Sequence, residues 1–385
     1  MPAKARSKSA IRARGKKVPA AQAAEAKAEE DGPWSGEVKL YPCVPKDWLW
    51  LPRPLRAVLG WTSICLYTLC FLTPVYGFAL LLPYSWSSPA LARCHYVMLA
   101  AIVASYLAPM REWPAFRALG QLWYEIFQFS TNFAPKDCLH AIARGEEQQV
   151  ILAMHPHGIV PFQAIMWASY CDQYFSDPAT GCSMFGFGAA ADAVAYLPFL
   201  RNWMGWVSAG SAAYNVLKRG LADGVSAICP TRNVRHLFVL PGGVAEIFTS
   251  TPGRNCIVFK GRTGLVRLAL ETGAKLAPVY VFGGTDFYHN LATSAGWLSW
   301  LSRRFKMGMT VFWGPFGQPV VPYTPRVTMA LGAPIDFPGG YEPGQATYSP
   351  EMVAAYHEAY LADIQTLFDR HKEAAGYKDS VLEIL

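Results

Sequence analysis

Residues 150–158 read Val-Ile-Leu-Ala-Met-His-Pro-His-Gly, an apolar run that ends in two histidines around a proline. The five apolar residues predict a buried strand, and the proline and glycine predict that it ends sharply. Residues two apart on an extended strand point the same way, so His155 and His157 are expected to face one cavity. A neutral imidazole at a strand end can take a proton from a bound alcohol. The stretch therefore predicts a catalytic site in which one imidazole is a general base.

Zinc ligation is the competing interpretation of this histidine pair. Imidazoles bind zinc, but a zinc site needs at least a third protein ligand. No His-x-x-Glu motif or cysteine pair lies nearby, and the nine cysteines, scattered from Cys43 to Cys256, include no Cys-x-x-Cys pair. We therefore expect no metal and no disulfide framework, and a reducing compartment is the better prediction.

A glycine turn, Gly242-Gly243, follows a short apolar run at residues 237–240 and precedes Glu246. Glycine lets the backbone approach a ligand closely, and the turn is expected to bring Glu246 back toward the edge of the sheet. A carboxylate beside an imidazole keeps the correct tautomer and stabilises the imidazolium formed during proton transfer. Backbone amides near Gly158, Gly242 and Gly243 are candidates for stabilising an oxyanion. A surface acid after an ordinary turn is the alternative for Glu246.

Four basic residues, Arg254, Lys260, Arg262 and Arg267, surround a loop and the start of a helix. Backbone amides at a helix N-terminus favour phosphate, and arginine adds bidentate hydrogen bonds. The group is expected either to hold the phosphates of a nucleotide-bearing thioester donor or to form a solvated basic face. The residues alone favour neither interpretation.

The pattern after about residue 113 favours an α/β fold. Residues 263–272 alternate apolar and charged positions as an amphipathic helix does, and Gly273 ends them. Residues 277–282 follow as a strand, and this alternation predicts a mixed, partly parallel sheet flanked by helices. Ser349-Pro350-Glu351 begins a last helix with a capping hydroxyl and a proline at the first helical position. The apolar stripe of that helix is expected in the core and consists of Val353, Tyr356, Tyr360, Ile364, Leu367 and Phe368.

Composition indicates contact with a membrane. Apolar residues make up 52% of the chain and charged residues 16%, which differs from an ordinary soluble domain. Residues 57–83 carry no charge and reach the roughly 20 residues that cross a bilayer, and a shorter uncharged stretch follows at residues 94–110. Positive residues on the outer flanks predict a hairpin with both ends in the cytosol, kinked at Pro74 and turning near Pro83. A shallow re-entrant hairpin and two buried helices of a soluble core are the alternatives.

The N-terminal segment is predicted to be a basic, disordered tail and linker. Seven of its first 17 residues are Lys or Arg, no acid precedes Glu25, and core-forming residues are scarce. No recognition module accompanies these charges, so nucleic acid is not an expected partner, and an anionic cytosolic leaflet is the simpler one. An organelle transit peptide is the lesser alternative. We predict a tail and linker at residues 1–45, a membrane hairpin at 46–112 and a catalytic domain at 113–385.

His155-Pro156-His157-Gly158, followed by Gly242-Gly243-x-x-Glu246, resembles the type-2 diacylglycerol acyltransferase family, which includes monoacylglycerol acyltransferases and some wax-ester synthases. Two positions depart from the family pattern. Asn202 stands where the family usually has an acid, and an upstream aromatic-Phe-Pro block appears only as Asn132-Phe133-Ala134-Pro135. Weaker similarity follows in order along the chain at Pro198-Phe199-Leu200-Arg201, residues 264–269, 278–283 and 332–335, and the closing helix with His371-Lys372.

The resemblance implies a glycerolipid-acyltransferase-like fold and a membrane-bound O-acyltransferase of the endoplasmic reticulum, with the lipid droplet as a second location. The implied reaction esterifies diacylglycerol to triacylglycerol with acyl-CoA as co-substrate and no cofactor. His157 is the preferred general base, His155 the second choice, and Glu246 orients the base. The implied partners are acyl-CoA, neutral glycerolipids and membrane lipids. A homo-oligomer is compatible with the resemblance but is not implied by it. The alternatives are monoacylglycerol or a fatty alcohol as acceptor, a hydrolase, which would lack the usual Gly-x-Ser-x-Gly elbow, and a non-enzymatic lipid-droplet or membrane scaffold.

Overall fold

The structure is a computed structural model, and it describes residues 38–72, 88–133, 149–174, 185–223, 236–291, 310–345 and 347–385, with single positions between 292 and 309. The basic tail before residue 38, the kink predicted at Pro74 and the turn predicted near Pro83 lie outside the described residues. Both uncharged segments are described in part, as the helices α2 (Arg53–Leu72) and α4 (Pro89–Leu107).

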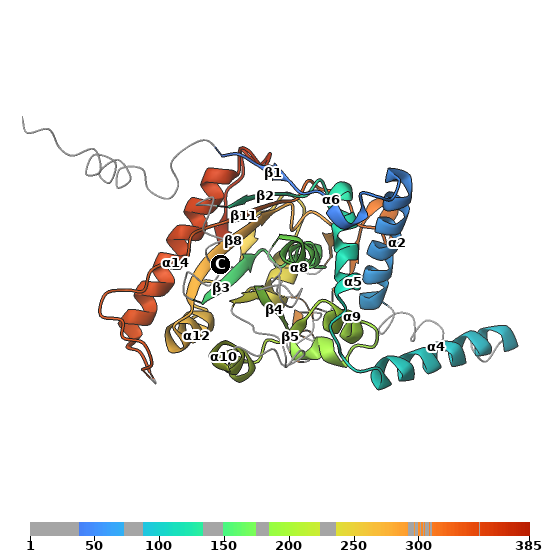
Figure 1. The fold of residues 1–385 in the computed structure, drawn as a ribbon, viewed down its shortest axis with the longest axis horizontal. Helices are drawn as coiled ribbons and strands as arrows, with labels where there is room; N and C mark the ends of the chain where they lie inside the picture. The colour runs from blue at the N-terminus through green and yellow to red at the C-terminus, as the bar shows by residue number, and fades with distance from the viewer. Residues whose placement is uncertain are drawn as a thin grey trace, which may run out of the picture. The chain divides into compact units, whose positions relative to one another are not determined.

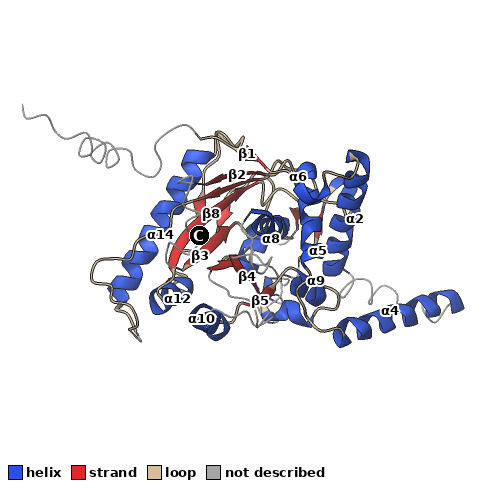
Figure 2. Cartoon of the chain, in the orientation of Figure 1, coloured by secondary structure: helices blue, strands red, loops and turns tan. Residues whose placement is uncertain are grey.

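A mixed eight-stranded sheet organises the described chain (Figures 1 and 2). Its central strand β3 pairs in parallel with β6 and β8, whereas β11 runs antiparallel to β8. The predicted mixed, partly parallel sheet flanked by helices is therefore confirmed. In spatial order, the strands are β1 (Tyr41–Pro42), β2 (Ser130–Phe133), β11 (Thr328–Leu331), β8 (Lys275–Phe282), β3 (Val150–His155), β6 (His236–Val239), β4 (Phe185–Ala190) and β5 (Ala209–Ser211).

The two faces of β3 pack against different helices. All six of its residues are buried, which is why this strand reads as a continuous apolar run. Val150, Leu152 and Met154 join the core cluster that includes α8 (Phe162–Tyr174). The alternating residues face α14 (Pro350–His371), whose Tyr360 hydroxyl donates to the Ala153 carbonyl at 3.3 Å. Figure 1 shows α14 and α8 on opposite sides of the sheet.

Two helices follow their predicted limits closely. The amphipathic helix α12 (Gly264–Thr272) ends at Gly273, which takes a φ of +71° that glycine adopts without steric cost. Ser349 caps α14 because its Oγ accepts from the Met352 N–H at 3.2 Å. The six predicted stripe residues of α14 are all buried. Burying each such side chain fully contributes about 1.5–3 kcal/mol, so the packing of α14 on the sheet adds substantially to the stability of the fold.

The remaining short elements complete the walls of the site. The helices are α5 (Pro114–Arg117), α6 (Leu122–Ile126), α9 (Leu200–Trp206), α10 (Tyr214–Asp223) and α11 (Gly243–Thr249), with the 3₁₀ turn η4 (Asp192–Tyr196). The small strands are β7 (Cys256–Ile257) paired with β12 (Glu383–Ile384), and β9 (His289–Asn290) paired with β10 (Phe312–Trp313).

The two apolar helices meet the rest of the protein differently. One face of α2 carries Ile64 and Tyr67 into the core, and Arg56 near its start pairs with Glu125 of α6 at 2.8 Å. The side chains of α4 are exposed or half-buried except for Ser105. Among the described residues, α4 is the one helix long and apolar enough to cross a membrane. That property therefore belongs to the second of the two uncharged segments, while α2 is partly a core helix.

Candidate active site

Glu246 ties three separate segments together at the carboxyl end of β3. Its Oε1 lies 2.8 Å from Nδ1 of His155 and accepts from the Val258 N–H at 2.9 Å. Its Oε2 accepts from the backbone N–H of His157 at 2.6 Å. The parallel pairing of β3 with β6 causes this meeting, because the turn after β6 arrives at the same edge of the sheet as the end of β3. The structure thus brings the predicted carboxylate and histidines together.

Close approach or a positive φ explains the glycines of both motifs. A Cβ atom at position 242 would lie 1.7 Å from Cδ of Glu246, so only glycine leaves room for this carboxylate. Gly158 has a φ of +70°, and a Cβ there would lie 2.5 Å from the Gly284 carbonyl oxygen. Gly243 also has a positive φ, and its N–H donates to the Leu240 carbonyl at 3.3 Å. Of the candidate oxyanion amides, that of Gly243 therefore already has an acceptor.

The buried Glu246 carboxylate is stabilised in its charged form. Burial alone raises the pKa of Glu246, but His155 and the two backbone N–H donors outweigh it. The pKa of Glu246 is therefore below its ordinary value. An ionised carboxylate accepts hydrogen bonds only, which matches the three donor positions that surround it.

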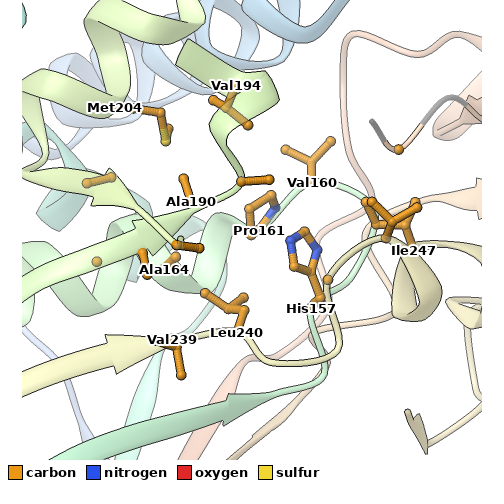
Figure 3. Close-up of a pocket in the computed structure, with 18 of the residues that line it drawn as sticks. His157, Val160, Pro161, Ala164, Ala190, Val194, Met204, Val239, Leu240 and Ile247 are labelled. Atoms are coloured by element: carbon orange, nitrogen blue, oxygen red, sulfur yellow. The ribbon is translucent and has the colours of Figure 1, made fainter. Parts of the chain in front are cut away.

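The two histidines occupy different surroundings. The His155 ring is fully buried on the α14 side of the sheet, with ring centroids 5.4 Å from Phe259 and 6.2 Å from Tyr360. Its Nε2 has no hydrogen-bond partner within the part of the chain that the structure describes. His157, beyond the end of the strand, lines a large cavity (Figure 3), whereas His155 is not among the lining residues. The expectation that both imidazoles face one cavity fails because His155 still belongs to the alternating pattern of β3.

The geometry of His157 suits a general base. Its Nδ1 lies 2.8 Å from the Gly158 carbonyl oxygen, an acceptor, so Nδ1 carries the proton and Nε2 keeps a free lone pair. Burial lowers the pKa of His157, although the Gly158 carbonyl and the charge of Glu246 act in the opposite direction. A lowered pKa keeps this imidazole neutral near pH 7, which is the form that accepts a proton.

The cavity beside His157 is apolar. Its volume is about 820 Å³, within the roughly 300–1,000 Å³ typical of ligand pockets. Figure 3 shows Val160, Ile247 and Leu240 around the imidazole, with Met204 on the opposite side of the cavity. An apolar chain fits such a cavity, and the imidazole is placed to act on a polar group at the end of that chain.

The four basic residues do not act as one group. Arg254 pairs with Glu383 at 2.6 Å, and Nη1 of Arg262 donates to the Pro241 and Gly242 carbonyls at 3.3 and 3.1 Å. Arg262 thus supports the glycine turn. Lys260 and Arg267 are exposed. None of the four lines the cavity. Gly264 and Leu265, at the start of α12, do line it, and Arg267 lies on the same helix.

Sequence reasoning missed Gln163, which lies on α8. Its Nε2 donates to the carbonyls of Pro156 and His157, both at 2.9 Å, and the side chain is fully buried. Two carbonyl acceptors fix the amide orientation, since only the NH₂ group can face them. The signal was present as a lone glutamine within an otherwise apolar stretch five residues after Gly158. Among the described residues, no cluster of three or more His, Cys, Asp or Glu side chains is placed to hold a metal.

Comparison with known proteins gives the family. The chain matches the family model of diacylglycerol acyltransferase over residues 93–385. It is 31% identical to acyl-CoA wax alcohol acyltransferase 2 of Homo sapiens, covering 68% of this chain and 78% of that protein. It is 28% identical to 2-acylglycerol O-acyltransferase 3 of Homo sapiens (69% and 74% covered) and 29% identical to diacylglycerol O-acyltransferase 2 of Homo sapiens (61% and 60% covered). No solved structure matches. Because the family model spans most of the chain and both motifs, this protein belongs to the diacylglycerol acyltransferase family and is an acyltransferase.

Proposed function

We propose that this protein is a membrane-bound O-acyltransferase that transfers a long-chain acyl group from acyl-CoA to diacylglycerol and so forms triacylglycerol. The observation that carries the proposal is the single imidazole of His157 in a large apolar cavity of a family member. The names of the similar proteins specify a wax alcohol, a 2-acylglycerol and diacylglycerol as acceptors. Each of these acceptors carries a hydroxyl group on a long apolar molecule, and such a molecule fits an apolar cavity that contains one imidazole.

In the proposed reaction, Nε2 of His157 accepts the proton of the acceptor hydroxyl while the oxygen attacks the thioester carbonyl. The new C–O bond forms, the C–S bond breaks, and the departing thiolate takes the proton from the imidazolium. Glu246 acts on the backbone of His157 and on the ring of His155, so it fixes the loop rather than the tautomer of the base. The backbone near Gly158 is the proposed oxyanion donor, because the Gly243 amide is already engaged.

The membrane attachment is part of the proposal. The helix α4 inserts into the bilayer of the endoplasmic reticulum, and the exposed apolar residues Leu55, Val58 and Leu66 of α2 lie against the same lipid. The division into a tail (1–45), a membrane hairpin (46–112) and a catalytic domain (113–385) with a glycerolipid-acyltransferase-like fold belongs to this proposal. Lys260 and Arg267, which are both exposed, would hold the acyl-CoA phosphates from the aqueous side.

An acceptor panel tests the proposal. The purified protein is given labelled oleoyl-CoA with dioleoylglycerol, monooleoylglycerol or hexadecanol, and the products are separated by thin-layer chromatography. We expect triacylglycerol as the main product. A preference for either other acceptor would replace diacylglycerol in the reaction, and release of free fatty acid alone would indicate a hydrolase. No acyl transfer to any acceptor would overturn the proposal and support a membrane scaffold.

The pH dependence of the reaction is expected to report His157. Its lowered pKa means that the ring stays neutral, and therefore basic, at pH values below the ordinary histidine value of 6.5. Activity should persist into mildly acidic solution and be lost only as the pH falls through the lowered pKa of His157. The check is a profile of kcat/KM from roughly pH 4.5 to roughly pH 8, because this profile reports the pKa values of essential groups in the free enzyme. An acidic limb centred above pH 6.5 would contradict this assignment.

Gln163→Met is expected to lower kcat about tenfold with little change in KM, because the carbonyls of Pro156 and His157 lose their donor and the loop shifts. Gln121→Met is the matched control. Gln121 is also fully buried, and its amide makes hydrogen bonds of 2.7 and 3.2 Å with Asp47; neither residue lines the cavity. Both variants should melt at lower temperature than the wild type. Equal kcat losses in the two variants would show that Gln163 serves stability alone.

A further inference from the structure

Four polar contacts converge on Ser105, in the last turn of α4. Its Oγ donates to Oδ1 of Asn202 at 2.6 Å and accepts from the Phe199 N–H at 2.8 Å. Its carbonyl oxygen accepts from Nη1 of Arg201 at 2.6 Å and from Nδ2 of Asn202 at 3.1 Å. Ser105 is the buried residue of α4. All three partners lie at residues 198–202, a block that the proposed proton chemistry does not use.

Arg201 satisfies the open end of α4. Besides Ser105, its Nη1 donates to the Ala108 carbonyl at 2.9 Å. The last carbonyls of a helix have no partner within the helix, and a positive charge at that end is favourable. A guanidinium is costly in hydrocarbon, so this contact belongs at the membrane–water boundary rather than at the bilayer centre.

Aromatic side chains surround the contact between Arg201 and the end of α4. Tyr106 lies under the Arg201 guanidinium, 5.6 Å from it, and its hydroxyl donates to the Tyr196 carbonyl. The Tyr196 side chain is 75% exposed, and that of Trp113 is 50% exposed and packs on Trp206 at the end of α9. Exposed tyrosine and tryptophan side chains are typical of the interfacial region of a membrane. These exposed aromatic side chains suit a position of the short helix α9 beside the lipid headgroups.

The contacts at Ser105 suit asparagine at position 202. The amide uses its oxygen toward the Ser105 hydroxyl and its nitrogen toward the Ser105 carbonyl. An aspartate has no donor for that carbonyl and would set a charged oxygen against it. Phe199 has a φ of +64°, which non-glycine residues keep only where surrounding contacts fix them, and its N–H donates to the Ser105 hydroxyl.

The opposite side of α9 lines the cavity. Leu200 and Met204, four residues apart, share the helix face that contributes to the lining. Leu72, at the end of α2, lines the cavity as well. In Figure 3, Met204 lies across the cavity from His157. One short helix thus contacts the membrane helix with one face and the cavity with the other.

We propose that residues 198–202 are a docking site for α4, and that α9, held there at the membrane boundary, is the wall past which a long-chain neutral lipid acceptor enters the cavity from the bilayer. The proposal rests on the proposed function, since it supplies the route of the acceptor to His157. Acyl-CoA, whose charged nucleotide stays in water, does not need this route. Weakening the contacts at Ser105 leaves a smaller fraction of molecules with the entrance in place and so weakens the apparent affinity for the membrane-dissolved acceptor.

The test compares a membrane-dissolved acceptor with a water-soluble one. Full-length protein in phosphatidylcholine vesicles receives oleoyl-CoA and either dioleoylglycerol in the bilayer or dihexanoylglycerol added from water. Ser105→Ala and Asn202→Asp are expected to raise the apparent KM for dioleoylglycerol about tenfold. The KM values for dihexanoylglycerol and oleoyl-CoA should stay within about twofold of wild type. If the acceptor panel identifies another acceptor class, its long-chain and short-chain forms replace these two.

Ser63→Ala is the matched control. Ser63 is a buried serine of α2 whose Oγ donates to the Gly60 carbonyl and accepts from Nε1 of Trp123, both at 2.8 Å. Its hydrogen bond from Trp123 ties α2 to α6, and neither of its two bonds reaches α9, so its loss should leave both acceptors' KM values unchanged. Equal losses on both acceptors in the Ser105 and Asn202 variants, no loss on either, or the same selective effect in Ser63→Ala would overturn the docking proposal. A wild-type protein inactive with every acceptor would instead overturn the proposed function.

Discussion

Replacing His157 by alanine is expected to lower kcat by about 10²–10⁴, the range that general-base help contributes. The imidazole lines the cavity, its Nδ1 is engaged by the Gly158 carbonyl, and its Nε2 is left to accept a proton. The substitution removes the base without removing the Glu246 contact, because that contact is made by the backbone N–H of residue 157. Single-turnover and steady-state rates of ester formation measure the loss, and a thermal melt shows that the fold survives.

Two controls separate His157 from a structural histidine. His371→Gln, on α14 outside the cavity, should keep near wild-type kcat, although the buried His371 ring contacts Leu367 and Asn132. Added imidazole should restore part of the activity of His157→Ala, since it can enter the vacated space beside the acceptor. His155→Ala should not respond to imidazole, because its ring is fully buried away from the cavity lining. Undiminished ester synthesis by His157→Ala would remove this residue from the mechanism.

Glu246→Gln is expected to lower kcat by about 10–10², less than loss of the base. The carboxylate accepts from the His157 and Val258 N–H groups and contacts Nδ1 of His155. A glutamine offers one acceptor and one donor, so at least one of these donors then faces an NH₂ group. A buried donor without a partner costs about 1–3 kcal/mol, which should also lower the melting temperature.

The matched control for this charge removal is Glu271→Gln. Glu271 pairs with Lys218 at 2.7 Å in a partly exposed ion pair, which contributes little to stability. Its kcat and melting temperature should therefore stay close to wild type. If Glu246→Gln turned over as fast as Glu271→Gln, the carboxylate would be a structural feature without influence on the position of His157.

Local sequence patterns were sufficient for some elements. The strand at 150–154, the helix ended by Gly273 and the helix capped by Ser349 were predicted to within one or two residues. Each depends on neighbours only: an apolar run, a glycine that can take a positive φ, and a hydroxyl three residues before the amide it caps. The meeting of the histidine motif with Glu246 followed from parallel strands whose ends share one edge.

Contacts between distant residues could not be predicted in this way. The two histidines have opposite surroundings because β3 ends at His155, so His157 lies on the loop and does not follow the alternation of the strand. Ser105 and Asn202 are separated by 97 positions, and neither lies in a pattern that names its partner. For the same reason, the pairing of Arg254 with Glu383, 129 positions away, could not be predicted. After Arg56, α2 has no charged residue that would mark an exposed face, so the burial of Ile64 and Tyr67 could not be predicted.

The central position of β3 has a consequence for biosynthesis. Both neighbours of this apolar strand, β6 and β8, come later in the chain, and β8 is complete only roughly 130 residues after β3 leaves the ribosome. At about 5–20 residues per second, the edge of β3 that pairs with β8 therefore stays unpaired for roughly 6–25 s, longer than the edge that pairs with β6. Unpaired strand edges recruit other chains. Slower translation of the stretch between β3 and β8 should therefore lower the yield of soluble nascent chains in a pulse-chase experiment, even though the finished enzyme is unchanged.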